Sequence, residues 1–417
     1  MSGSMNNREN NEKNAPQKAI IAAVDSGAYD MESSLRELTL LAESAGAEIV
    51  AEIVQKLDTP DRNTYLGSGK LLEAKTVIET LGAELLIADC ELTSARVRNM
   101  EEITDVAVID RTTLILDIFA QNAKTAEGKL QVELAQLRHR LLYLAGSGAA
   151  LSRLGGGIGT RGPGETKLES DRRHIRTRIA LLEKRLLELS ERRGLTRERR
   201  KKGSVPVVSL VGYTNVGKSS LLNALTGSDV YAEDKLFATL DPTARKLYVG
   251  DLQQVVLIDT VGFVSRLPHR LVDAFKSTLL EMAESDLILT VADASSSEWK
   301  LQLEVTEDII SQMGCSDIEQ FTVFNKCDLI DTAAALPGIA VSAKTGFGLE
   351  RLLGEISKRL SERVIRCEIL LPFDKLSLMA AVREKGNVLS EEYTEDGLLL
   401  KATVDKTMYH MIEPYVR

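Results

Sequence analysis

Residues 205–225 read VPVVSLVGYTNVGKSSLLNAL, and this stretch decides the fold of the segment around it. An apolar run of strand character leads into the pattern GxxxxGK[ST], and an apolar run with helical spacing follows. A strand, a loop and a helix in this order bind nucleotide phosphates through successive backbone amides. The eight loop positions are Gly212, Tyr213, Thr214, Asn215, Val216, Gly217, Lys218 and Ser219. We expect Lys218 to neutralise the β- and γ-phosphates and the Ser219 hydroxyl to bind Mg²⁺.

Three later segments supply Mg²⁺, γ-phosphate and base contacts that a phosphate loop lacks by itself. The run VVLIDTVGF at 255–263 ends an apolar strand with Asp259, suited to hold Mg²⁺ through water, and Gly262, whose amide can contact a γ-phosphate. The run FTVFNKCD at 321–328 ends another strand, and its Asp328 carboxylate can accept two hydrogen bonds from guanine, a pair that adenine cannot offer. The nucleotide contacts expected from these runs and from VSAK at 341–344 are Asp259, Thr260, Val261, Gly262, Asn325, Lys326, Asp328, Ser342, Ala343 and Lys344. The sequence therefore predicts that the base is guanine.

Charge is distributed unevenly along the chain. The 417 residues carry a net charge of −9, yet residues 131–203 hold 18 Lys and Arg against 8 Asp and Glu. The rest of the chain therefore carries −19. Such asymmetry indicates a polyanionic partner for the basic segment, the alternative being a solvated charged helix.

Two apolar stripes run through this basic segment. Spacings of three and four residues place the members of each stripe on one face of a helix. The first stripe is Leu130, Leu134, Leu137, Leu141 and Leu144, and the second is Ile175, Ile179, Leu182, Leu186 and Leu189. Two such helices joined by a short connection are predicted to pair antiparallel, as a stalk with the connection at its tip.

The connection between the stripes holds six glycines in the ten positions 155–164. Gly157, Gly159 and Gly162 spell GxGxxG, but the flanking sequence is helical, so this is not a dinucleotide-binding fingerprint. Glycines let the backbone approach a crowded surface, and the neighbouring cations can contact phosphates; a flexible hinge is the alternative. The candidate RNA-binding residues are Arg153, Gly155, Gly156, Gly157, Gly159, Arg161, Gly162, Lys167, Arg172 and Arg173.

The remaining segments carry no catalytic motif. Residues 17–120 alternate short apolar runs with helical patterns, which predicts a parallel sheet covered by helices, and residues after about 364 fit a small α+β domain. The four cysteines lack paired spacing, the polar residues 1–16 read as a disordered tail, and no apolar run approaches the ~18 residues of a membrane span. A reducing cytoplasm is the expected compartment.

With these motifs the chain resembles the HflX family, which comprises translation-factor-class GTPases related to the Obg proteins. The resemblance covers nearly the whole chain and includes LDIFAQNAKTAEGKLQVELAQLRHRLLYL at 116–144, GGGIGTRGPGETKLESDRR at 155–173 and FATLDPTAR at 237–245. It implies a multidomain α/β protein. The expected parts are a disordered tail at 1–16, an N-terminal α/β domain at 17–125, an antiparallel helical stalk at 126–203, a P-loop GTPase domain at 204–363 and a C-terminal α+β domain at 364–417.

The resemblance also implies partners and further site residues. Family members hydrolyse GTP and split ribosomes after binding the large subunit and its rRNA, which implies a cytoplasmic, partly ribosome-associated protein; we expect a monomer. The alternative is a GTP-gated assembly factor of the large subunit that does not split ribosomes. By resemblance, further nucleotide contacts are Phe237, Ala238, Thr239, Leu240 and Asp241. Thr239 would complete the Mg²⁺ coordination, with Thr243 the less favoured candidate.

Two positions bear on the rate of hydrolysis. Ras-like enzymes orient the attacking water with a glutamine directly after the glycine of the third motif, but here that residue is Phe263. Slow intrinsic hydrolysis is predicted, with a partner or a rearrangement supplying the missing group. Asn215 matches an asparagine that holds K⁺ in related GTPases, and it is equally suited to bracing the loop.

Overall fold

The computed structural model describes residues 16–154, 163–202, 205–227, 236–237, 239–240, 242–249, 253–268, 271, 282–331, 336–361, 364–385 and 387–417. The tail expected at 1–16 lies outside these residues except for Pro16. The chain forms two compact units. The first unit holds the described residues up to Leu186 together with the segments around Phe237 and Arg266, and the second unit holds the remainder.

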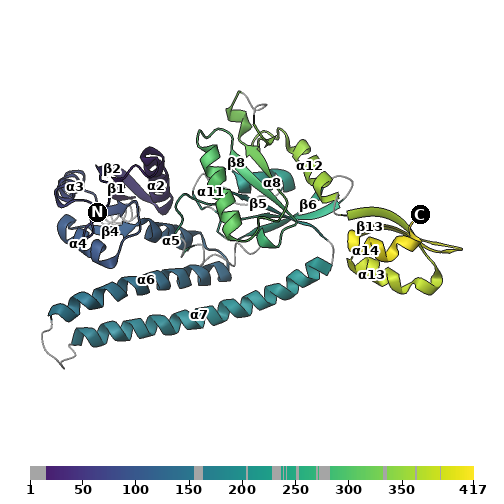
Figure 1. Cartoon of the computed structure of the whole chain (residues 1–417), viewed down its shortest axis with the longest axis horizontal. Helices are drawn as coiled ribbons and strands as arrows, with labels where there is room; N and C mark the ends of the chain where they lie inside the picture. Colours follow the sequence, from purple (N-terminus) through teal and green to yellow (C-terminus); the bar gives the residue numbers. More distant parts are fainter. Residues whose placement is uncertain are drawn as a thin grey trace, which may run out of the picture. The chain divides into compact units, whose positions relative to one another are not determined.

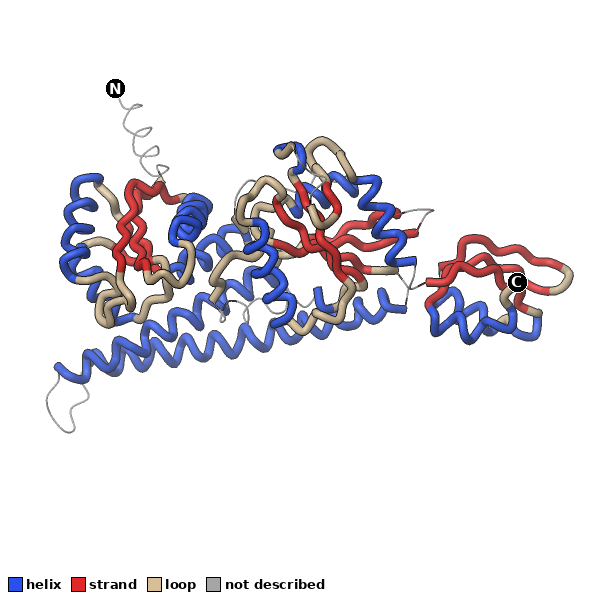
Figure 2. Tube along the Cα trace, turned by 45° about the horizontal axis from the view of Figure 1, so that its top comes forward, coloured by secondary structure: helices blue, strands red, loops and turns tan. Residues whose placement is uncertain are grey.

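A parallel sheet covered by helices begins the first unit. Its elements are β1 (Gln17–Asp25), α2 (Met31–Ala45), β2 (Ala47–Lys56), α3 (Ser68–Leu81), β3 (Leu85–Ala88), α4 (Ser94–Thr104), β4 (Ala107–Asp110) and α5 (Arg111–Asn122). The strand order is β2-β1-β3-β4, and all neighbouring strands are parallel. Helices α3 and α4 pack together, as do α2 and α5, and helices flank the strands on both sides in Figure 2. The α/β pattern predicted for this region is confirmed.

Helices α6 (Ala126–Leu154) and α7 (Pro163–Lys202) form the antiparallel pair (Figures 1 and 2). Two ion pairs join them, Arg178 to Glu133 at 2.7 Å and Arg138 to Glu183 at 2.7 Å. Leu134 and Leu182 are buried, and the other members of both predicted stripes are partly buried. Both stripes are thus at least partly removed from solvent, and the helix pair that their spacing predicted is present. No helix in the described part of the chain is both long enough and apolar enough for a membrane span.

The second unit contains a six-stranded sheet. Its elements are β5 (Val207–Gly212), α8 (Lys218–Thr226), β6 (Thr243–Val249), β7 (Gln253–Asp259), β8 (Leu287–Asp293), α11 (Trp299–Gln312), β9 (Gln320–Asn325), β10 (Ile339–Ala340) and α12 (Leu349–Ser361). The order is β10-β9-β8-β5-β7-β6, and only β6 runs antiparallel to its neighbour. The carboxyl ends of β5, β7, β8 and β9 therefore meet at one edge, where ligands bind in sheets of this kind.

The C-terminal part is a three-stranded antiparallel sheet with two helices. Its elements are β11 (Val364–Leu371), α13 (Ser377–Lys385), β12 (Asn387–Thr394), β13 (Gly397–Asp405) and α14 (Lys406–Ile412), with strand order β11-β13-β12. Ile369, Leu400 and Val404 are fully buried in its core. The predicted α+β character and the multidomain α/β fold class are confirmed, whereas the domain limits at 125, 203 and 363 remain predictions.

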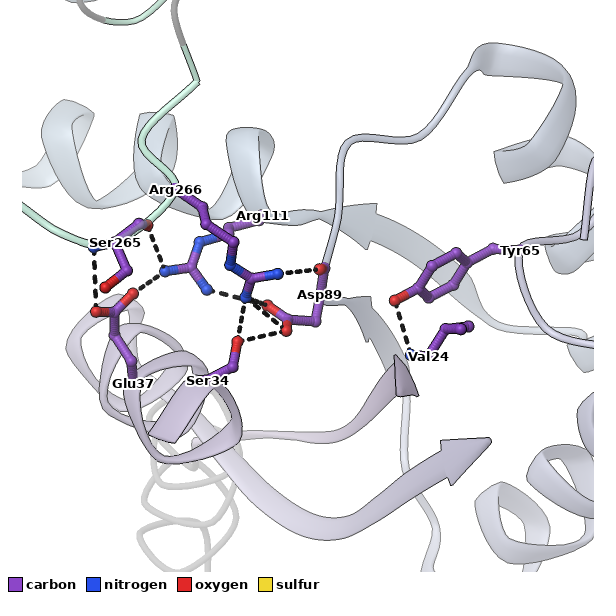
Figure 3. Close-up of polar contacts among 8 residues, drawn as sticks. All are labelled: Val24, Ser34, Glu37, Tyr65, Asp89, Arg111, Ser265 and Arg266. Carbon is purple, nitrogen blue, oxygen red and sulfur yellow. Dashed lines mark hydrogen bonds and ion pairs between the residues drawn. The ribbon is translucent and has the colours of Figure 1, made fainter. Parts of the chain in front are cut away.

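A buried carboxylate lies at the carboxyl end of strand β3 in the first unit's sheet. Asp89, which follows β3, has no exposed side-chain surface (Figure 3). It accepts hydrogen bonds from Ser34 Oγ at 2.6 Å, from Arg111 Nη1 at 3.0 Å and from Arg266 Nη2 at 2.7 Å. The Arg266 guanidinium also stacks on Tyr29, 4.0 Å from the ring centroid. Burial raises the pKa of the Asp89 carboxyl, and the Arg266 cation opposes that shift.

A second carboxylate, that of Glu37, binds the main chain at Ser265, next to Arg266. Glu37 pairs with Arg111 and accepts a hydrogen bond from Ser265 N at 3.2 Å, while Arg111 Nη2 donates to Ser265 O at 2.9 Å (Figure 3). Two carboxylates thus face two guanidinium groups. Such a cluster tolerates burial because its charges compensate one another, so each member is needed for the others.

Replacing Asp89 with asparagine is expected to destabilise the first unit strongly, because two guanidinium groups lose their shared carboxylate. We expect a loss of about 3 kcal/mol, the lower end of the range for one partner of a buried pair. The control is Arg36→Ala, which removes the exposed i,i+4 pair of Arg36 with Glu32 and is expected to cost under ~1 kcal/mol. Hydrogen exchange of the buried β1 and β3 amides measures the loss of stability in both variants. Equal effects of the two variants would contradict the role given to Asp89.

Candidate functional site

The loop between β5 and α8 is closely confined by its neighbours. Gly212 has φ 157° and Gly217 has φ 86°. A Cβ on Gly212 would lie 2.2 Å from Val291 O, and one on Gly217 would lie 2.3 Å from Asn325 Nδ2. Side chains are therefore excluded at both positions by contact as well as by conformation. Asn215 also adopts a left-handed conformation, with φ 60°.

Lys218 begins α8 and is buried. Its Nζ donates hydrogen bonds to Gly212 O at 3.0 Å and to Tyr213 O at 2.7 Å, so the ammonium lies inside the curve of the loop. Burial lowers the pKa of Lys218 to about 8, and the nearby Asp259 carboxylate acts in the opposite direction. An anion bound at this loop would stabilise the charged ammonium.

Three oxygen-bearing side chains meet beside the loop. Ser219 Oγ lies 2.8 Å from Thr239 Oγ1 and donates to Asp259 Oδ2 at 2.6 Å. Asp259 Oδ1 is buried without a hydrogen-bond partner among the described residues, and burial raises the pKa of this carboxyl. Hydroxyl and carboxylate oxygens suit Mg²⁺, and a bound cation or its water shell would satisfy the unpartnered oxygen. Thr243, the other candidate, is the first residue of β6.

The segment after β7 is bonded to the phosphate loop by its main chain. Phe263 N donates to Gly212 O at 3.1 Å, and Phe263 O accepts from Thr214 N at 2.7 Å. A Cβ on Gly262 would lie 2.7 Å from Thr214 Cγ2, so glycine is required here. The Phe263 side chain is 1% exposed. Thr260 and Val261 are buried as well, with Thr260 Oγ1 donating to Leu210 O at 2.7 Å.

The residues predicted to contact guanine form one bonded group at the ends of β9 and β10. Asn325 Nδ2 donates to Val216 O at 2.9 Å, and Asn325 Oδ1 accepts from Ala343 N at 3.0 Å. Asp328 is exposed, and its Oδ1 accepts from Ser342 Oγ at 2.6 Å. That hydrogen bond lowers the pKa of the Asp328 carboxyl, which keeps it ionised as a hydrogen-bond acceptor. Lys344 is exposed beside this group.

Lys326 joins the same group to the phosphate loop. Its Nζ donates to Asn215 O at 2.8 Å and pairs with Asp293 at 2.7 Å. Sequence analysis did not find Asp293, which ends β8. The available signal was an acidic residue directly after the apolar run at 287–292, but its partner becomes evident only once β8 and β9 are known to be neighbours.

One residue predicted to contact the nucleotide has its side chain elsewhere, and two others are not described. Phe237 packs against Phe119, with ring centroids 4.6 Å apart, and its carbonyl accepts from Asn122 Nδ2 at 2.9 Å, both within the first unit. Leu240 is buried. Ala238 and Asp241 lie outside the described residues.

The predicted RNA-binding set is only partly described. The residues outside the description are Gly155, Gly156, Gly157, Gly159, Arg161 and Gly162. Arg153 lies in α6 and Lys167 in α7. Arg173 is exposed, whereas Arg172 Nη2 donates to Leu144 O at 2.6 Å and so joins the two helices.

Models of four protein families match successive parts of the chain. Their descriptions are GTP-binding GTPase N-terminal at 32–120, GTP-binding GTPase middle region at 122–200, 50S ribosome-binding GTPase at 207–326 and HflX C-terminal domain at 329–408. The first match falls on the N-terminal α/β part and the second on α6 and α7. The third covers β5 to β9, and the fourth covers β10, α12 and the C-terminal sheet.

Whole-chain relatives agree with the family models. A protein named GTPase HflX from Caldanaerobacter subterraneus subsp. tengcongensis is 49% identical over 390 residues, 93% of this chain and 91% of that protein. GTPase HflX from Escherichia coli K12 is 42% identical over 377 residues, 88% of each chain. A solved GTP-binding protein from the archaeon Sulfolobus solfataricus, in complex with GDP, is 25% identical with a TM-score of 0.44 and covers 83% of this chain and 99% of its own. Because the two GTPase HflX proteins match most of the chain at more than 40% identity, the protein belongs to the HflX family of GTPases and is a GTP hydrolase.

Proposed function

We propose that GTP and Mg²⁺ bind at the loop between β5 and α8, with Lys218 on the β- and γ-phosphates and Gly262 on the γ-phosphate. Ser219 and Thr239 would ligate Mg²⁺ directly and Asp259 through water. The approach of these three oxygen-bearing side chains supports the assignment, as does the unpartnered Asp259 Oδ1. When bound, Mg²⁺ supplies positive charge that offsets the charge developing on the phosphates.

The guanine base would lie against the group at the ends of β9 and β10. Its N1–H and 2-amino group would donate to the Asp328 carboxylate, and its O6 would accept from the Ala343 and Lys344 amides. Ser342 already orients the carboxylate, and Asn325 joins the base site to Val216 of the phosphate loop. Lys326 forms a second connection, to the Asn215 carbonyl of the same loop.

The α6–α7 pair is proposed to carry the protein to the large ribosomal subunit, where binding splits the ribosome. The observation that carries this proposal is the antiparallel pair itself, which brings the basic, glycine-rich connection to one end of two long helices. The description of the family model at 207–326, a 50S ribosome-binding GTPase, is consistent with it. Cations on a slender element can reach rRNA phosphates where a bulky one would be excluded.

Sedimentation of intact ribosomes tests the splitting activity. Ribosomes are incubated with the protein and a non-hydrolysable GTP analogue and are then separated on a gradient. Free subunits are the expected result. An unchanged ribosome peak, with the protein bound only to added free large subunits, would instead assign it to subunit assembly.

Changing Asp328 to asparagine is expected to weaken GTP binding and favour xanthosine triphosphate. An amide NH₂ replaces one carboxylate oxygen, and xanthine offers a C2 carbonyl in place of the 2-amino group. Fluorescent-nucleotide titration of both triphosphates measures the change. Asp331→Asn, which changes an exposed carboxylate three residues further on, serves as the matched control. Unchanged GTP affinity in Asp328→Asn would reject the base site.

Replacing residues 155–164 with a short Gly-Ser turn is expected to abolish splitting while GTP affinity stays near normal. The flanking helices belong to the first unit as far as Leu186 and the phosphate loop belongs to the second, so the nucleotide site should be unaffected. Splitting and GTP titration are measured side by side. Splitting by the replacement variant would make the connection a hinge, and loss of GTP binding would place it in the nucleotide site.

A triple variant of Arg153, Arg161 and Arg173 to alanine is expected to weaken large-subunit binding and flatten its salt dependence. Binding releases fewer counterions for each phosphate contact that is lost, so the slope of log affinity against log salt concentration falls by about one per contact. Arg172→Ala is the separate control, because its guanidinium is bonded to the Leu144 carbonyl in α6. Binding is measured across a salt series, and an unchanged slope in the triple variant would exclude these arginines from the interface.

Large subunits are expected to raise GTP turnover at least about tenfold, since the buried Phe263 offers no polar atom to water. That factor corresponds to ~1.4 kcal/mol of barrier. Exchanging Na⁺ for K⁺ should add to the rate if Asn215 holds the cation, and Asn215→Ala should remove that increment. Fast turnover by the isolated protein would contradict activation by the ribosome.

A further inference from the structure

The residue directly after Gly262 does not supply the side chain that orients the attacking water in Ras-like enzymes. The following residue, Phe263, is 1% exposed and is held by main-chain hydrogen bonds to Gly212 and Thr214. Its ring is buried and carries no polar atom, so it cannot orient water. Hydrolysis of GTP nonetheless requires a water molecule aligned with the γ-phosphate.

Thr214 occupies the space beside Gly262. A Cβ built on Gly262 would lie 2.7 Å from Thr214 Cγ2, 2.8 Å from Thr214 Cα and 3.0 Å from Lys218 Nζ. The Thr214 main chain is fixed, since its N donates to Phe263 O at 2.7 Å. The third loop residue, the phosphate-neutralising lysine and the γ-phosphate-contacting glycine are therefore immediate neighbours.

The Thr214 hydroxyl is buried and has no partner within the part of the chain that the structure describes. The residue is 5% exposed, and its Oγ1 is buried without a hydrogen bond. Two other hydroxyls of the site are bonded: Ser219 Oγ to Thr239 and Asp259, and Thr260 Oγ1 to Leu210 O. A buried hydroxyl is unfavourable without a partner, and valine would fill the same space without that cost.

We propose that the Thr214 hydroxyl orients the attacking water against the γ-phosphate, in place of the side chain that is absent at position 263. A hydroxyl has one donor and two acceptor sites, so it can donate to a γ-phosphate oxygen and accept from water at the same time. The inference rests on the phosphate site proposed above. It adds a catalytic residue to that site.

The chemical step balances without a base on the protein. The water oxygen forms a bond to the γ-phosphorus while the bond from that phosphorus to the β–γ bridging oxygen breaks. The bond's electron pair stays on the β-phosphate of the departing GDP, and the proton of the water passes to a γ-phosphate oxygen. Thr214 holds the water in line throughout and keeps no proton.

Thr214→Val, Thr214→Ser and Thr214→Ala test the hydroxyl in the full-length protein without ribosomes. Single-turnover GTP hydrolysis is measured beside the affinities for GDP and for a non-hydrolysable GTP analogue. We expect valine and alanine to slow hydrolysis at least about tenfold, with both affinities within about twofold of the unchanged protein, and serine to stay within about threefold of its rate. Thr306→Val, which removes a buried threonine hydroxyl from α11, is the matched control.

Trapping of GDP with aluminium fluoride and Mg²⁺ gives a second readout, because this complex mimics the transferring phosphoryl group. Thr214→Val is expected to bind GDP normally and to lose the aluminium fluoride complex, whereas Thr214→Ser retains it. Wild-type hydrolysis by the valine variant, or equal rates for serine and alanine, would overturn the proposal. Unchanged GDP affinity in Lys218→Ala would instead show that the phosphate site itself is wrongly assigned, which separates the two failures.

Discussion

The main chain of the phosphate loop approaches its neighbours so closely that no side chain fits between them, and the rest of the site depends on this contact. Gly217 lies against the Asn325 amide and Gly212 against the carbonyl of Val291. Residues at the ends of two further strands bond to the same loop: Asn325 and Lys326 at the end of β9, and Phe263 after β7. The loop is therefore preorganised, since its conformation is fixed by contacts that a phosphate does not have to create.

Local sequence predicted the parts of this site that lie within one run of residues. Strand β5 and helix α8 read directly from apolar spacing, and the left-handed glycine at 217 belongs to the motif. The two leucine and isoleucine stripes likewise predicted the helix pair, because a helix brings every third and fourth residue onto one face. Such patterns are legible because the residues that cooperate are close in the chain.

Pairings between distant residues could not be predicted in the same way. Asp293 and Lys326 meet because β8 and β9 are neighbours in the sheet, and nothing in either run states that order. Phe237 was expected beside the nucleotide from its place in a family motif, yet its ring lies against Phe119. Arg172 was expected to contact phosphate and is bonded to the α6 backbone. Composition shows that an arginine is present, but it does not show which acceptor its guanidinium binds.

The attachment of Arg266 to Asp89 fixes the chain shortly after the glycine proposed to contact the γ-phosphate. Gly262 and Arg266 are four residues apart, and the chain passes from the second unit into the first between them. A four-residue span reaches at most ~14 Å. While Arg266 stays bonded to Asp89, the distance of Gly262 from this buried carboxylate is therefore limited to the reach of one short segment.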